Sequence, residues 1–231
     1  MTEILTAIVP NFPRAQAELW RSFVQTIQMV LGSGSISFVI GIMLGVGLVV
    51  MKKGGILQNL VLHNILDKAI NIFRSIPFLI LIILLIPLSR FITGTAIGVT
   101  GAMVPLVIGT VPFFSRQVEA AVSEVDAGLI EASQAMGLSP LKIIYRVYLR
   151  ESIPTLTRVT QITAISLLNL STMAGAIGAG GLGDFAIRFG HQMGLRDLMW
   201  LTIAIILLLV TAIQVSGNLI IKKTDKTKRG V

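Results

Sequence analysis

The 231-residue chain has no cysteine, only two histidines and few charged residues. Asp, Glu, Lys and Arg make up 13% of it, against roughly 25% in ordinary soluble domains. The lack of cysteine excludes disulfides, thiol nucleophiles and Cys-based metal sites. Hydrophobic residues amount to 54%, so the composition predicts an integral membrane protein, and we expect an all-α one.

The sequence also lacks a recognisable enzyme site. Acidic residues occur singly and no group has the spacing of metal ligands, so we predict neither catalytic nor metal-binding residues. A G-x-x-x-x-G-K-[ST] loop is missing, so the chain cannot itself hold ATP in a loop of that kind. Gly178, Gly180 and Gly183 do fit G-x-G-x-x-G, but no strand precedes them, and we interpret them as a close-packed turn.

The net charge of +8 does not indicate nucleic-acid binding. Aromatic residues are few, and the basic residues do not form one stripe that a phosphate backbone could follow. The basic residues instead indicate how the chain is oriented in a membrane. If successive loops alternate between the two sides, 14 Lys and Arg lie on one side and 5 on the other, which accounts for all 19. The positive-inside rule then predicts an outside N-terminus and a cytoplasmic C-terminus.

Charge-free stretches locate the membrane helices, because about 20 apolar residues cross a bilayer. Four such stretches predict four spans, and the apolar run Ile76 to Leu88, extended back to Ile65, predicts a fifth. In a single domain over 1–231 the predicted spans are 22–51, 65–88, 93–115, 157–178 and 198–221. We also expect a short amphipathic helix ending near Pro10 and a solvated basic tail after the last span.

The longest polar segment, residues 128–154, predicts a helix, a tight turn and a second helix on the cytoplasmic side. Gly137 can take the positive φ that ends a helix, while Ser139 and Pro140 suit the start of the next one. An apolar face at helical spacing comprises Leu141, Ile144, Tyr145, Tyr148 and Leu149. Lys142, Arg146 and Arg150 recur on another face. Taken alone, this pattern also fits an ordinary amphipathic surface helix.

Three further features lie inside the predicted spans. Gly41 and Gly45 predict close helix packing. Arg74, just before Pro77, is either an anchor at the membrane interface or part of a gate. In the fourth span, small and polar residues share one face, which indicates a translocation path or an interhelical seam. These residues are Ser166, Asn169, Thr172, Met173 and Ala176, and the bulk of Met173 suits a plug in a narrow pore.

The segment around Gly137 resembles the cytoplasmic loop of ABC importer permeases, which reads Glu-Ala-Ala, three residues, then Gly. Glu131, Ala132 and Gly137 match, whereas Arg150 stands where the family has proline. Four blocks in order resemble the membrane subunits of bacterial methionine ABC importers: NIFRSIPF from Asn71, IPLSRFITGTAIG from Ile86, GLIEASQAMG from Gly128 and AGAIGAGGLGD from Ala174.

The resemblance implies the five-helix ABC importer permease fold in a bacterial inner membrane. It implies a homodimer with the pathway at its interface and an extracellular or periplasmic methionine-binding protein. Two copies of a cytoplasmic ATPase would hold ATP and Mg²⁺, so no cofactor is expected on this chain. The loop would then be a coupling helix that docks on the ATPase through Glu131, Ala132, Gly137, Leu141, Ile144, Tyr145 and Tyr148.

Three alternatives stay open. A permease for polar amino acids has a similar Arg-x-x-Pro segment, here Arg74 to Pro77. A transporter driven by ion gradients is disfavoured, because four spans are charge-free and no inverted repeat is visible. A membrane scaffold for a partner complex would predict that the ATPase contact can be lost without loss of any flux.

Overall fold

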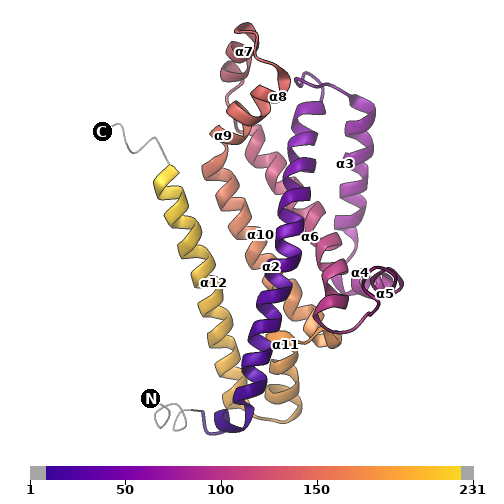
Figure 1. The fold of residues 1–231 in the computed structure, drawn as a ribbon, viewed down its shortest axis with the longest axis vertical. Coiled ribbons are helices and arrows are strands. Elements are labelled where there is room, and N and C mark those ends of the chain that lie inside the picture. Colours follow the sequence, from indigo (N-terminus) through magenta and orange to yellow (C-terminus); the bar gives the residue numbers. More distant parts are fainter. Residues whose placement is uncertain (1–8, 225–231) are drawn as a thin grey trace. The chain divides into compact units, whose positions relative to one another are not determined.

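The computed structural model describes residues 9–224. The helix expected before Pro10 and most of the basic tail therefore fall outside the described residues. All regular structure between residues 9 and 224 is helical, which confirms the all-α prediction (Figure 1).

Four helices of the described chain are long and apolar enough to cross a membrane. They are α2 (Phe12–Met51), α6 (Gly98–Ser123), α10 (Ile153–Ala174, continued to Ala179) and α12 (Arg196–Thr224). Helix α2 begins ten residues before the predicted span, and α6 extends eight residues past its predicted end. The charge-free windows located these four long helices but not the polar helical turns attached to them.

The predicted span 65–88 is not one helix. It is divided among α3 (Leu60–Ser75), α4 (Phe78–Leu84) and α5 (Ile86–Thr93). The first break follows from Pro77, because a residue before proline avoids helical geometry and Ile76 is extended, with φ −83° and ψ 122°. At the second break, Pro87 lies in the first turn of α5, where a backbone N–H would have no partner within the helix. Five continuous spans are thus replaced by four long helices and three shorter ones.

Short helical segments form the rest of the described chain. Between α6 and α10 lie α7 (Ala127–Ala135), α8 (Pro140–Ile143), η1 (Ile144–Tyr148) and α9 (Leu149–Glu151). Between α10 and α12 lie η2 (Gly175–Ala179), α11 (Gly181–Phe185) and η3 (Ala186–Gln192). The first set carries the predicted cytoplasmic loop, and the second carries the glycine-rich segment.

The chain forms two compact units. The first unit holds residues 77–108, residues 164–213 and the part of α2 up to Ser35. Its buried apolar residues form two clusters, one around Met29 and Leu106 and one around Leu182, Phe185 and Leu198.

The second unit holds residues 36–76, residues 109–163 and the end of α12 from Gln214. We call its single buried cluster the second core: Val46, Val49, Val50, Phe114, Val118, Ala121, Val122, Ile143, Tyr148 and Val159. Packing at Gly41 and Gly45 is confirmed, because a Cβ at Gly45 would lie 2.6 Å from the carbonyl oxygen of Ser115 and from Val118 Cβ.

Candidate functional site

The polar loop has the predicted helix, turn and helix. Asp126 caps α7 by accepting the backbone N–H of Leu129 at 3.2 Å, which satisfies a donor at the helix start. The helix ends at Gly137, whose φ of 74° is the left-handed conformation that glycine adopts without strain. Its N–H donates to the carbonyl of Gln134 at 2.9 Å. This part of the loop is fixed by local interactions.

The second helix of the loop begins as expected but does not continue as a regular α-helix. Ser139 takes the extended N-cap position without a side-chain cap bond, and Pro140 follows in the first turn. From Ile144 to Tyr148 the chain forms a π-helical turn, in which the N–H of Leu149 donates to the carbonyl of Ile144, five residues back. The wider turn changes the helical register from this point on.

This change of register moves Tyr148 away from the face on which it was predicted. Ile143 and Tyr148, five residues apart, are 1% and 5% exposed and belong to the second core. Burial raises the pKa of Tyr148. Ile144 is partly buried against the same core. Tyr148 therefore anchors the loop to the second unit and does not lie on its exposed face.

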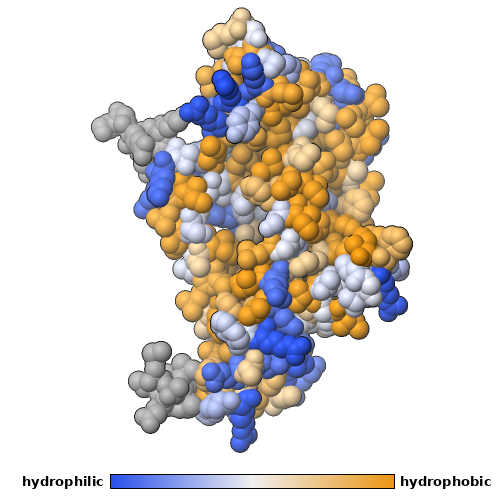
Figure 2. All heavy atoms as spheres, in the orientation of Figure 1, coloured by the Kyte–Doolittle hydropathy of each residue, from blue (hydrophilic) through white to orange (hydrophobic). Residues whose placement is uncertain are grey.

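Four large apolar side chains remain exposed between Leu129 and Tyr145 of the loop. We call them the docking patch, and their exposed fractions are 48% for Leu129, 72% for Met136, 74% for Leu141 and 75% for Tyr145. Glu131, Ala132 and Lys142 lie nearby in sequence and are also exposed. Figure 2 shows hydrophilic residues gathered at the end of the second unit that carries α7 and α8. Large apolar groups exposed in polar surroundings are typical of a protein-binding surface.

Sequence analysis predicted only half of the exposed apolar side chains in this patch. It identified Leu141 and Tyr145 but missed Leu129, in the first turn of α7, and Met136, at its C-cap. Both could have been identified from the sequence, because they are large apolar residues in an otherwise polar segment.

The predicted stripe on the fourth span lies on a side of α10 that the first unit leaves largely uncovered. Asn169, Met173 and Ala176 are exposed, with Met173 at 37%. Ser166 and Thr172 are partly buried, and the hydroxyl of Thr172 donates to the carbonyl of Leu168 at 3.1 Å. The stripe thus has the free surface that either a path or a contact with a second subunit needs.

The glycine-rich segment beyond α10 is a close-packed turn, as interpreted. Gly178, Gly180 and Gly181 have φ of 97°, 79° and 83°, and no strand precedes them in the described chain. Two side chains of α2 hold this turn. Gln25 Oε1 accepts the N–H of Gly181 at 2.9 Å, and Thr26 Oγ1 accepts the N–H of Leu182 at 2.8 Å. Sequence analysis missed both partners, although each is a polar residue inside a charge-free span.

An ion-pair cluster ties η3 to α2 within the first unit. Arg188 donates to Asp184 at 2.8 Å and to Glu18 at 2.9 Å. These hydrogen bonds raise the pKa of Arg188, that with Asp184 most. The cluster fixes the segment that follows the glycine turn.

Arg74 and Pro77 flank the first helix break. Arg74 is exposed in the last turn of α3, and Pro77 precedes α4. Their roles as anchor or gate stay predictions. No group of three or more His, Asp or Glu side chains able to hold a metal ion is found among the described residues.

Helix α12 makes a polar contact with α10. Gln161 Nε2 of α10 donates to the carbonyl of Gln214 at 2.7 Å, and its side chain fills the space left by Gly217. This polar contact joins α10 and α12 within the second unit, as is common for helices in membranes.

Comparison with known proteins gives consistent matches. The family profile described as "Binding-protein-dependent transport system inner membrane component" matches residues 37–226. The probable D-methionine transport system permease protein MetI of Vibrio cholerae is 45% identical over 201 residues, which are 87% of this chain and 89% of that protein. The methionine import system permease protein MetP of Bacillus subtilis is 43% identical over 216 residues, which are 93% and 97% of the two chains.

Solved structures match as well. A chain of the inward-facing MetNI methionine ABC transporter aligns with a TM-score of 0.89 and 41% identity, over 91% of this chain and 98% of that one. An amino acid ABC transporter crystallised with histidines aligns with a TM-score of 0.75 at 18% identity, which shows a shared fold alone.

Proposed function

Because the chain belongs to the family of binding-protein-dependent transport system inner membrane components, we propose that it is the permease subunit of an ATP-driven methionine importer. The observation that carries the proposal is the identity of 41–45% to methionine permeases over most of the chain. The chain is not an enzyme, and ATP and Mg²⁺ are held by a separate ATPase subunit, of which two copies serve a permease dimer. An external binding protein delivers the substrate.

The ATPase passes its conformational change to the permease at the docking patch. Leu141 and Tyr145 are exposed for contact with an ATPase groove, while Ile143, between them in sequence, is fixed in the second core. Tyr148 is fixed there too, alongside Val118 of α6 and Val159 of α10. A displacement of the patch as the ATPase dimer closes on ATP is therefore passed to both membrane helices, because packed cores shift as units.

The stripe on α10 lines the translocation path. In a homodimer, two copies of Asn169, Met173 and Ala176 face the shared interface, with Met173 narrowing the path and hydroxyl or amide groups offering hydrogen bonds. Such a path suits a small amino acid without net charge. The excess of Lys and Arg on one side supports a cytoplasmic loop 128–154 and C-terminus, with the N-terminus outside the bacterial inner membrane.

Uptake by the reconstituted complex tests the substrate. With the permease, its ATPase and the binding protein in proteoliposomes, we expect ATP-dependent accumulation of labelled methionine, because both curated relatives are methionine permeases. Competition between unlabelled D- and L-methionine determines the stereochemical preference. An ATPase variant unable to hydrolyse ATP is the control. If polar amino acids inhibit the uptake and methionine does not, the chain serves a polar amino-acid importer instead.

A further inference from the structure

Helix α3 is attached to the second unit in an unusual way. None of its residues belongs to the apolar clusters of the described chain, and Ile70 is its only buried residue. Its large apolar side chains, such as Val61, Ile65 and Ile72, are exposed. Since lipid is as apolar as these side chains, burying them against protein would gain little in a membrane. Polar contacts therefore contribute strongly to holding α3 in place.

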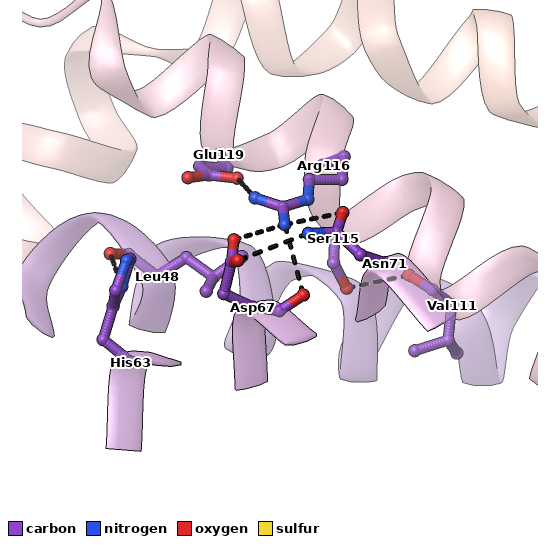
Figure 3. Close-up of polar contacts among 8 residues, drawn as sticks. All are labelled: Leu48, His63, Asp67, Asn71, Val111, Ser115, Arg116 and Glu119. Atoms are coloured by element: carbon purple, nitrogen blue, oxygen red, sulfur yellow. Dashed lines mark hydrogen bonds and ion pairs between the residues drawn. The ribbon is translucent and has the colours of Figure 1, made fainter. Parts of the chain in front are cut away.

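Those polar contacts come from residues spaced by four along one face of α3: His63, Asp67 and Asn71. His63 Nδ1 lies 3.1 Å from the carbonyl oxygen of Leu48 in α2. Figure 3 shows Arg116 of α6 reaching to the other two. Its Nη2 donates to the carboxylate of Asp67 and, at 2.9 Å, to Asn71 Oδ1. These polar groups thus lie on the side of α3 that contacts α2 and α6, while most of its large apolar side chains are exposed.

Arg116 is also held on its own helix. Its Nη1 donates to Glu119 Oε2 at 2.7 Å (Figure 3), and its side chain is 19% exposed. A guanidinium engages several acceptors at once because its donors have a fixed planar arrangement, which a lysine ammonium cannot reproduce. The cluster therefore fixes both the distance and the orientation between α3 and α6.

Helix α6 connects this cluster to the docking loop. Phe114, Val118 and Val122 pack in the second core with Ile143 and Tyr148. At about 100° per residue, Arg116 lies on the opposite side of α6 from those apolar residues, and Glu119 lies between the two sides. One side of the helix thus holds the loop and the other holds α3. Helix α3 in turn ends directly at the break before Pro77.

We propose that Arg116 is a positioning residue for transport, which fastens α3 to α6 so that a displacement of the docking loop carries α3 with it. The proposal rests on the function proposed above. Arg116 and Asp67 contact neither ATP nor substrate in this account. Their loss leaves the ATPase bound and active but separates hydrolysis from uptake.

Spin labels test the joint movement directly, because the chain has no native cysteine. The exposed positions Asn64→Cys on α3 and Ser123→Cys on α6 report the separation of the two helices in the complete complex. We expect the same distance distribution without nucleotide and with trapped ATP when Arg116 is present. Arg116→Gln is expected to give a distribution that broadens or shifts between the two states.

Transport measurements complete the test. Arg116→Gln is expected to lower methionine uptake per ATP hydrolysed by about tenfold, a usual size for coupling between sites, with the ATPase still retained. The isosteric Asp67→Asn should act in the same direction and serves if Arg116→Gln does not assemble. The exchange Arg116→Asp with Asp67→Arg should restore coupling in part. Lys68→Gln, which removes an exposed charge next to Asp67, is the matched control and should couple normally.

Different results separate this inference from the proposed function. Normal coupling in both Arg116→Gln and Asp67→Asn would overturn the positioning role, as would a distance between α3 and α6 that changes with ATP in the protein with Arg116 intact. A complex with Arg116 intact that takes up no methionine would instead contradict the proposed function, whatever the spin labels report.

Discussion

Replacing Tyr145 by aspartate is expected to release the ATPase subunit from the purified permease. Tyr145 is 75% exposed, and docking would bury its ring against the partner. A buried carboxylate without a partner costs about 3 kcal/mol or more, which weakens binding at least about a hundredfold. Retention of the ATPase on tagged permease, and its affinity for permease in nanodiscs, measure the effect.

Two control variants separate the loss of docking from general damage. Tyr145→Phe keeps the ring and should retain the ATPase. Asn64→Asp adds the same negative charge at an exposed position outside the loop and should also retain it. Unchanged retention and affinity in Tyr145→Asp would show that the docking patch does not bind the ATPase.

Replacing Gly183 by alanine is expected to cause the largest loss of stability. A Cβ at this position would lie 2.7 Å from Thr172 Cα and 2.8 Å from its carbonyl carbon, and still closer to its oxygen. These are backbone atoms at the end of α10, and the turn cannot move away easily because Gln25 and Thr26 hold it. Overpacking of this kind costs about 3 kcal/mol, which lowers the melting temperature by about 6–12 °C.

Thermal unfolding in detergent, followed by tryptophan fluorescence, measures this difference. Gly47→Ala is the matched control, because its Cβ would meet only the flexible end of Met51, at 3.1 Å, and the helical backbone favours alanine. It should melt within about 2 °C of the parent, since surface-like changes are usually within about 0.5 kcal/mol. Equal melting temperatures for both variants would contradict the close packing of Gly183 against α10.

Features set by neighbouring residues could be predicted from the sequence. The positive φ at Gly137, the packing of Gly41 and Gly45, and the all-helical class follow from residue type and spacing. The helix, turn and helix of the loop could be predicted for the same reason, because the turn and the exposed Leu141 and Tyr145 lie within one short segment.

Features that depend on distant residues or on a change of helical register could not be predicted from the sequence. Tyr148 was assigned to the wrong side of the loop because the sequence does not reveal the π-helical turn before it. Arg116 and Asp67 are 49 residues apart and join two helices, but no local pattern in the sequence indicates that they meet. Gln161 likewise reaches a backbone carbonyl on α12 that no local pattern indicates. In a membrane protein such polar contacts carry much of the helix association.

The central claim is that the loop 128–154 lies in the cytoplasm and is covered there by the ATPase. Membrane-impermeant maleimide, applied to the cysteine-free chain carrying Tyr145→Cys or Met193→Cys, tests both parts, since both positions are exposed. The account predicts that Tyr145→Cys is labelled only in inside-out vesicles and is protected when the ATPase is bound, while Met193→Cys is labelled in intact spheroplasts. Labelling of Tyr145→Cys in intact spheroplasts would contradict the account.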